Sequence, residues 1–254
     1  SERRNPANDR VVQNHSLMSA NPTFLVTGVN SGLGKFLHKS LPDSIGLTRE
    51  NSKQVLSQDH DNLVILHSAF NSKRDIPDYS QYVEDNYIFT QKLMTLKYEK
   101  FIYFSTIDVY AETFNPYSFM KRCIEDYIQR VDAQAVILRL SAILGPDTRR
   151  NSLVRLIDGE DLTLQKNSDF NYILQSDILD ALDTVRNCNG VYNFIAQGNV
   201  TLGEIAEQYN KSVNFGNYKY SSNLGSREGL VNLYPHKDRT SMDVVRLFLE
   251  ENND

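Results

Sequence analysis

The sequence predicts a doubly wound α/β fold, in which helices cover both faces of a parallel sheet. Three observations lead to this prediction. Short and almost continuously apolar segments are typical of strands that are buried on both faces. They alternate with longer segments whose apolar residues recur at helical spacing, and this alternation is typical of parallel α/β sheets. The chain has 254 residues, 40% hydrophobic and 23% charged, as in ordinary globular proteins.

The elements of the expected sheet lie within the first 140 residues. Strands are predicted at 23–27, 44–48, 62–68, 101–105 and 135–140. Helices are predicted at 35–41, 78–96 and 117–131. The segment 50–61 is too short and too polar for a complete helix and strand. One strand of the usual sheet is therefore expected to be missing or rudimentary.

The elements after Gly145 and Pro146 are shorter and more mixed, which predicts a small C-terminal lobe at 147–254 that partly returns to the sheet. The expected elements are a helix at 152–158, a strand-like segment at 161–165, a helix at 177–186 capped by Asp177, a strand at 190–195, a helix at 201–209 capped by Thr201, and a final helix at 241–250 capped by Ser241. Residues 22–146 form the other predicted domain. Residues 1–21 are polar and aperiodic and are expected to be a disordered tail, with Met18 a candidate natural start.

Composition excludes several classes of protein. The chain carries 27 Lys and Arg against 32 Asp and Glu, a net charge of −5, and has no dense basic block, so nucleic-acid binding is not expected. Only Cys123 and Cys188 are present, without partners at metal-ligand spacing, which favours a reducing, cytoplasmic compartment and no metal site. No apolar run approaches the length of a membrane span, so no membrane association is expected.

A glycine-rich turn follows the first predicted strand. Gly28, Gly32 and Gly34 stand between this strand and a helix, with Asn30, Ser31 and Leu33 among them. Glycines allow the backbone to turn tightly and to approach a pyrophosphate, whose charge sits at the positive N-terminus of the helix. The alternative is a turn that uses glycine for its geometry alone. The position after the first strand favours a dinucleotide-binding loop, and residues 22–146 are predicted to be a dinucleotide-binding domain.

The end of the second predicted strand bears on the type of dinucleotide. An acidic residue there would bind the ribose hydroxyls of NAD and repel a 2′-phosphate. This chain has Thr48 and Arg49 instead. A hydroxyl and a guanidinium favour the phosphate, so NADP is the predicted cofactor and NAD the alternative. The competing interpretation of Arg49 is a solvated surface cation.

A second chemical signal is the pair Tyr117 and Lys121, spaced i and i+4 at the start of a predicted helix. This spacing places the phenol and the ammonium on one helix face. A nearby ammonium stabilises a phenolate and lowers the pKa of the tyrosine, which suits proton exchange near neutral pH. The preceding strand ends in Ser105 and Thr106, whose hydroxyls are expected to face Tyr117 across the cofactor crevice.

Taken together, these residues resemble the short-chain dehydrogenase/reductase superfamily, and within it the NAD(P)-dependent sugar epimerase/dehydratase branch. The resemblance covers about residues 23–209 and rests on TGVNSGLG, VILHSA, Asn86–Leu93, FSTIDVY, YSFMK, LRLSAILGP, YILQSDILDAL and GVYNF. It implies a Rossmann-like sheet with a substrate-binding lobe. It also implies that Thr106 binds a substrate oxygen, that Tyr117 is the general acid/base, and that Lys121 holds the nicotinamide ribose.

The resemblance implies further that Ser68 and Ala69 line the cofactor path, whereas His67 is expected to be structural. The sequence also departs from the branch. The glycine spacing is closer to that of the classical branch than to that of the extended one, and the segment from Thr106 to Tyr117 is much shorter than in extended members. Sugar 4,6-dehydratases carry an Asp-Glu pair where this chain has Ile107 and Asp108, so dehydratase activity is not expected.

The predicted function is an NAD(P)-dependent oxidoreductase that transfers hydride to a keto group of a nucleotide-activated sugar, with Tyr117 as general acid. Two alternatives are an epimerase that retains NAD tightly and a non-catalytic protein that senses NADP. The resemblance implies a nucleotide-sugar substrate and a homodimer built from helices 78–96 and 117–131. Arg149, Arg150 and Arg155 are candidates for binding its diphosphate, and the polar segment 214–226 for contacts with sugar or base.

Overall fold

The computed structural model describes residues 22–72, 78–224 and 230–251, so the expected tail at 1–21 lies outside the described residues. Its centre is a six-stranded sheet in the order β2-β1-β3-β4-β5-β9, and every pairing in it is parallel. The strands are β1 (Thr23–Thr27), β2 (Ile45–Leu47), β3 (Leu63–His67), β4 (Lys100–Thr106), β5 (Val136–Leu140) and β9 (Gly190–Phe194). The predicted doubly wound parallel sheet is confirmed.

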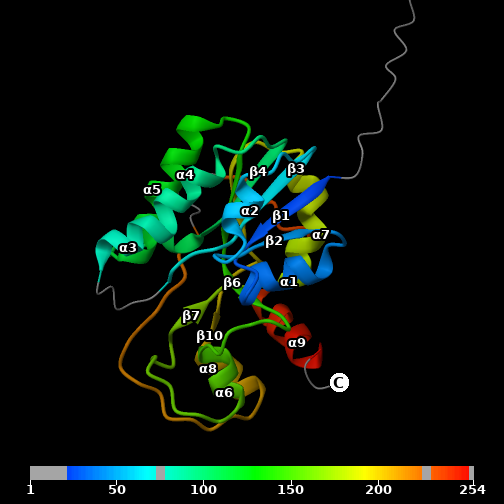
Figure 1. The fold of residues 1–254 in the computed structure, drawn as a ribbon. Coiled ribbons are helices and arrows are strands. Elements are labelled where there is room, and N and C mark those ends of the chain that lie inside the picture. The colour runs from blue at the N-terminus through cyan, green and yellow to red at the C-terminus, as the bar shows by residue number, and fades with distance from the viewer. Residues whose placement is uncertain (1–21, 73–77, 225–229, 252–254) are drawn as a thin grey trace, which may run out of the picture.

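Helices cover both faces of this sheet (Figure 1). One face carries α1 (Gly32–Ser40) and α7 (Gln175–Arg186), and the other α5 (Pro116–Val131) with the helical segment that precedes β4. Neighbouring strand residues point to opposite faces. Leu25 packs in the core on the α5 side, whereas Val26 packs in the core on the α1 side, and both are fully buried.

The helix predicted at 78–96 is present but is not uniform. It consists of α3 (Tyr79–Val83), a π-helical turn η1 (Glu84–Ile88) and α4 (Phe89–Leu93). Asp78 caps it, because its side chain accepts from the backbone N–H groups of Ser80 and Gln81. The π turn shifts the side chains that follow around the helix axis, and such turns are frequent at functional sites.

The segment 50–61 contains the short helix α2 (Ser52–Leu56) and no strand, as expected. The sheet therefore ends at β2, one strand short of the usual arrangement, in which a further strand lies outside it.

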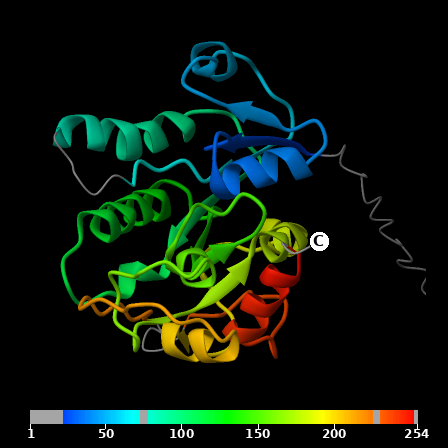
Figure 2. The same ribbon diagram turned by 90° about the horizontal axis from the view of Figure 1, so that it is seen from below.

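The C-terminal part adds two small strand pairs below the sheet. They are β6 (Ala142–Leu144) with β8 (Tyr172–Leu174), parallel, and β7 (Asp169–Phe170) with β10 (Val200–Thr201), antiparallel. Around them lie α6 (Ser152–Ile157), α8 (Leu202–Gln208) and α9 (Ser241–Glu251). Figure 2 shows α8 and α9 on the side of the molecule away from α3 and α4.

Three predictions for this part were wrong in detail. The segment 161–165 forms no strand, and its Leu164 makes only an isolated bridge with Tyr218. Asp177 does not cap α7 from outside; it lies in the first turn, where its carboxylate accepts from the N–H of Leu174 at 3.2 Å. Thr240, not Ser241, caps α9, because its hydroxyl accepts from the N–H of Asp243 at 3.2 Å. Thr201 caps α8 as predicted.

Candidate active site

A cleft with a volume of about 1160 Å³ lies at the carboxyl ends of the central strands. The strand order reverses between β1 and β3, and ligands of open α/β sheets bind at such a point. The cleft brings most of the predicted site residues together: Gly28, Asn30, Ser31, Gly32, Leu33, Arg49, Ser68, Ala69, Thr106, Tyr117 and Lys121. Gly34 is buried beneath the glycine loop and does not line the cleft.

The three predicted glycines differ in backbone conformation and in the space around them. Gly28 has a φ of 74°, and a Cβ there would stand 3.0 Å from the backbone N of Ala69. Gly34 allows close packing, because a Cβ would stand 2.4 Å from the carbonyl oxygen of Thr27. Gly32 has a φ of 58°, but a Cβ would meet nothing within 4 Å, so the space beside it is open. The loop thus forms a tight turn with an open side at the N-terminus of α1.

A buried chain of hydrogen bonds fixes this loop to β3. The Thr27 hydroxyl oxygen accepts from the backbone N–H groups of Ser68 and Ala69, at 3.0 and 2.9 Å, so its proton is directed to Nδ1 of His67. Thr90 donates to a backbone carbonyl, and its oxygen therefore accepts from Nε2 of the same imidazole at 2.9 Å. Burial lowers the pKa of His67 to about 3, so the ring is neutral. His67 orders the loop and does not line the cleft.

The start of α5 places Tyr117 at the cleft. Asn115 caps the helix by accepting from the N–H of Tyr117 at 2.8 Å, and Pro116 occupies the first helical position, where its missing N–H costs nothing. One turn later, Lys121 is 4% exposed and donates to the Phe104 carbonyl at 2.8 Å. Its ammonium also lies over the Phe70 ring, 4.4 Å from the centroid.

Burial has opposite consequences for these two side chains. Burial lowers the pKa of Lys121 to about 7, although Glu125 acts against this change. Burial, followed by the charge of Asp108, raises the pKa of Tyr117, while its hydrogen bond with Thr106 acts in the lowering direction. The lowering of the Tyr117 pKa that the Tyr and Lys pair predicts is therefore absent in the protein alone, and the phenol keeps its proton at neutral pH.

Thr106 connects Tyr117 to a second polar pair. It ends β4 and caps the short 3-10 helix η2 (Ile107–Tyr110) by accepting from the N–H of Asp108 at 3.2 Å. The Asp108 carboxylate accepts from the hydroxyl of Tyr220 at 2.7 Å. Burial raises the pKa of Asp108. The Tyr220 ring also stacks on Phe170, with centroids 4.6 Å apart. The hydroxyl of Tyr220 thus brings the C-terminal part of the chain to Asp108, beside Thr106 and Tyr117.

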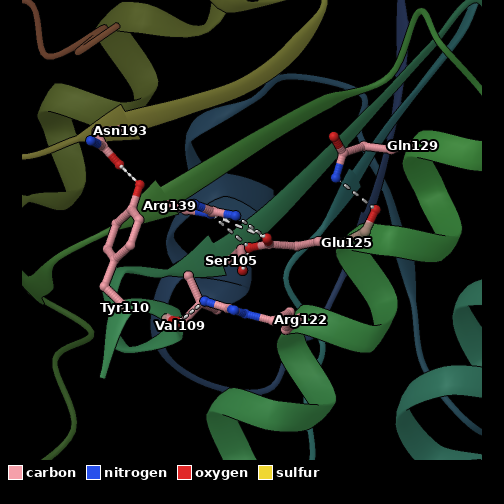
Figure 3. Close-up of polar contacts among 8 residues, drawn as sticks. All are labelled: Ser105, Val109, Tyr110, Arg122, Glu125, Gln129, Arg139 and Asn193. Carbon is pink, nitrogen blue, oxygen red and sulfur yellow. Dashed lines mark hydrogen bonds and ion pairs between the residues drawn. The ribbon is translucent and has the colours of Figure 1, made fainter. Parts of the chain in front are cut away.

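Beneath the site, a buried ionic network joins α5 to the sheet (Figure 3). Glu125 is 1% exposed, accepts from the Ser105 hydroxyl, and pairs with Arg139, whose Nη2 lies 2.7 Å from the carboxylate. The Arg139 guanidinium also lies over the Tyr110 ring, 4.8 Å from its centroid. Ser105 and Arg139 are opposite each other in the register of β4 and β5. The network therefore fixes the end of β4, where Thr106 lies, relative to α5, which carries Lys121.

Of the three arginines predicted as candidates for binding a diphosphate, only one lies at the cleft. Arg149 lines the cleft and donates to the Ser31 hydroxyl at 2.6 Å, next to the glycine loop. Arg150 pairs with Asp158 and Glu160, and Arg155 lies 3.6 Å from Glu160. Neither Arg150 nor Arg155 lines the cleft.

The polar segment 214–226 is only partly described, because residues 225 and 226 lie outside the described ranges. Within it, Tyr220 reaches the cleft, whereas Asn214 is bound to the Asp161 carboxylate at 3.2 Å.

Among the residues that line the cleft without having been predicted as site residues are Asp85, Asp108 and Ser141. Ser141 is 6% exposed, and its hydroxyl has no hydrogen-bond partner among the described residues. A buried hydroxyl without a partner is costly, so a ligand or a water molecule is expected to bind it. The position of Ser141 directly after a buried strand was the one signal that could have indicated it.

Across the ranges that the structure describes, no helix has the length and apolarity that crossing a membrane requires. The same ranges contain no cluster of three or more His, Cys, Asp or Glu side chains that could hold a metal ion.

Solved structures with a similar fold include UDP-sugar 4-epimerases and a protein solved with NADPH. UDP-glucose 4-epimerase from Thermotoga maritima, solved with UDP-glucose, has a TM-score of 0.70 at 15% identity, covering 91% of this chain and 98% of its own. UDP-glucuronic acid 4-epimerase from Bacillus cereus, solved with UDP-glucuronic acid and NAD, has a TM-score of 0.68 at 18% identity, covering 90% and 98%. RMD from Pseudomonas aeruginosa, solved with NADPH, has a TM-score of 0.67 at 15% identity, covering 91% and 100%.

No protein-family model and no curated protein sequence matches the chain. At these identities the comparisons show a shared Rossmann-like fold with these UDP-sugar 4-epimerases and with RMD, over nine tenths of the chain.

Proposed function

We propose that this protein is an NAD(P)-dependent oxidoreductase that acts on a nucleotide-activated sugar, within the short-chain dehydrogenase/reductase superfamily. One observation carries the proposal: Thr106, Tyr117 and Lys121 line the same cleft as the glycine loop. A dinucleotide-binding loop alone would fit a sensing protein. A phenol, a hydroxyl and a buried ammonium beside it are the groups that proton transfer to a carbonyl needs.

The glycine loop fits the pyrophosphate of a dinucleotide. The open space beside Gly32 and the N-terminus of α1 offer backbone N–H groups to an anion, and the first turn of α1 contains no acidic residue that would oppose one. Arg149, which already bonds Ser31 at 2.6 Å, adds a positive charge to this end of the cleft. When bound, the nicotinamide supplies the hydride chemistry that amino-acid side chains lack.

The chain's own residues hold and transfer the proton. Tyr117 keeps its proton because burial raises its pKa, so its hydroxyl is ready to donate to a carbonyl oxygen that gains negative charge. The Thr106 hydroxyl lies beside it and is suited to hold the same oxygen. Lys121, anchored by the Phe104 carbonyl, is the group that in its protonated form would stabilise the phenolate once the proton has left.

For the cofactor we propose NADP, with Arg49 as the residue that binds the 2′-phosphate and NAD as the alternative. Arg49 lies at the end of β2, lines the cleft and is 83% exposed, so its guanidinium is accessible to a phosphate. Of the similar structures, the Bacillus cereus epimerase was solved with NAD and RMD with NADPH, so they favour neither dinucleotide.

A second candidate function is an epimerase that retains its dinucleotide. It is favoured by the number of 4-epimerases among the similar structures. The short segment between Thr106 and Tyr117 favours the reductase. A shorter segment leaves a more open pocket, whereas an epimerase must keep its keto intermediate bound. Dehydration is not proposed, because Ile107 cannot protonate a leaving hydroxyl.

The deciding experiment combines binding and turnover. The purified protein is first analysed by mass spectrometry for a retained dinucleotide, and NADPH consumption is then followed with a panel of 4-keto nucleotide sugars. A reductase consumes NADPH stoichiometrically with at least one member. Interconversion of sugar epimers without net NADPH consumption would establish the second candidate, and absence of both activities with intact binding would favour the sensing protein.

A further inference from the structure

Arg49, the residue proposed for the 2′-phosphate, already has an acidic partner. Its Nη2 lies 3.1 Å from Oδ2 of Asp85, which belongs to the π turn η1 and also lines the cleft. In a usual dinucleotide site the acid that meets the ribose follows the second strand. Here a basic residue stands at that position, and the carboxylate comes from the helix after β3.

The two members of this pair differ in freedom. The Arg49 side chain is 83% exposed, whereas the Asp85 side chain is 13% exposed. Two amides also bind the carboxylate: Gln81 donates to Oδ1 at 2.8 Å and Asn71 to Oδ2 at 3.0 Å. Asp85 is therefore held in place by several hydrogen bonds. Arg49, in contrast, has a long side chain in solvent, and its guanidinium can rotate away from Asp85.

We propose that Asp85 is a specificity-determining residue of the dinucleotide site, which opposes a 2′-phosphate and tolerates a 2′-hydroxyl. The inference rests on the proposed function, since it concerns the dinucleotide of that site. A phosphate bound by Arg49 would lie beside a fixed carboxylate of like charge and would have to compete with it for the guanidinium. A ribose hydroxyl carries no charge and can donate a hydrogen bond to the same carboxylate.

This arrangement makes the two residues antagonists. Arg49 favours NADP and Asp85 favours NAD, so the preference of the unaltered protein is the difference between two opposing contributions. Removing the carboxylate must then increase the preference for the phosphate, whichever dinucleotide the unaltered protein prefers.

The test is the ratio of the dissociation constants of NADH and NADPH, measured by calorimetry at low salt for the unaltered protein and for Asp85→Asn. The ratio is expected to shift toward NADPH by about fivefold or more, as removal of one adjacent like charge implies. Asp126→Asn is the matched control: it removes a carboxylate from an exposed position of α5 outside the cleft, and the ratio should stay within about twofold. Asp85→Ser is the second variant if the asparagine variant does not fold.

An unchanged ratio in both Asp85 variants overturns the inference. A shift toward NADH also overturns it, because Asp85 would then be holding Arg49 in position for the phosphate. In either case binding of the dinucleotides leaves the proposed function standing. If the unaltered protein binds neither NADH nor NADPH, the proposed function fails, and this inference fails with it.

Discussion

Burial and the Asp108 carboxylate both raise the pKa of Tyr117, so the phenol keeps its proton at neutral pH. Its conversion to a proton acceptor requires a positive charge close by, and Lys121 is the cation one helical turn away. A raised pKa suits the proposed reduction, in which Tyr117 begins protonated.

Tyr117→Phe removes only the phenolic hydroxyl and therefore tests the proposed role of Tyr117 as proton donor. General acid catalysis contributes about 10² to 10⁴ in rate, so kcat is expected to fall by at least about a hundredfold, while dinucleotide affinity stays within about twofold. Tyr127→Phe, on the same helix but outside the cleft, is the control and should retain activity. A Tyr117→Phe enzyme with more than half of the original kcat would exclude Tyr117 as the proton donor.

Lys121 gives the stability of the protein a pH dependence with a definite sign. The pKa of Lys121 is about 7 in the folded protein, whereas an ordinary lysine has a pKa of 10.5. Between these two pH values the unfolded chain therefore binds more protons than the folded protein. Stability therefore rises with pH across this window, by no more than about 1.4 kcal/mol per pH unit, and below pH 7 the full cost of burying the ammonium remains.

The prediction is that Lys121→Met reduces this rise. Urea unfolding of the dinucleotide-free protein at pH 7 and pH 9.5 measures it, with the exposed Lys39→Met as control. The same change of stability with pH in all three proteins would show that Lys121 is charged when folded.

At the scale of elements, α5 and β5 depend on a buried ion pair. Glu125 and Arg139 are 1% and 7% exposed, and the carboxylate also accepts from Ser105. Breaking a buried pair from one side leaves an uncompensated charge and typically costs about 3 to 5 kcal/mol.

Glu125→Gln is therefore expected to lower the free energy of unfolding by about this amount, measured by denaturant titration, whereas Asp126→Asn on the exposed side should change it by less than about 0.5 kcal/mol. Replacing both partners, as in Glu125→Leu with Arg139→Met, should recover much of the loss. Full stability of the single variant would mean that Arg139 finds another partner.

The elements that could be predicted are those with a strong local pattern. The strand β4 is a continuous apolar run, and α5 begins with a capping residue followed by a proline. The local sequence is therefore sufficient to predict both elements. The strands β6, β7, β8 and β10 have two or three residues each and pair with partners far along the chain, as Ala142 does with Tyr172. No local period marks such strands.

The same distinction applies to the site. The glycine loop and the Tyr117 and Lys121 pair have spacings that chemistry constrains, and they could be read locally. Tyr220 reaches Asp108 over a sequence separation of 112 residues, and Asp85 reaches Arg49 over 36. These contacts depend on how the chain folds back, and nothing near either residue indicates its partner.

At the scale of the whole molecule, the outer surface of the helices beside the cleft carries apolar side chains. Val83, Phe119 and Val131 are 37%, 55% and 54% exposed, although the inner sides of these helices already cover the sheet. That helices 78–96 and 117–131 pair across a twofold axis to form a homodimer remains a prediction, and such a pairing would cover exposed apolar side chains of this kind.

Light scattering at micromolar concentration measures this directly, and twice the 29.1 kDa chain mass is expected. Phe119→Asp should shift the mass toward that of one chain, because a charge would be buried in the interface. A single-chain mass for the unaltered protein would contradict the dimer.

The sheet that ends at β2 also has a consequence for how the molecule behaves in concentrated solution. An edge strand with unpaired backbone groups is a template on which another chain can add a strand and begin to aggregate. Here the edge has three residues, and Asn51 folds back over it, donating to the Gly46 carbonyl and accepting from the Thr48 N–H, both at 2.8 Å. One asparagine thus makes part of the hydrogen bonds of the absent strand, and fewer backbone groups on this edge are left for a neighbouring molecule to pair with.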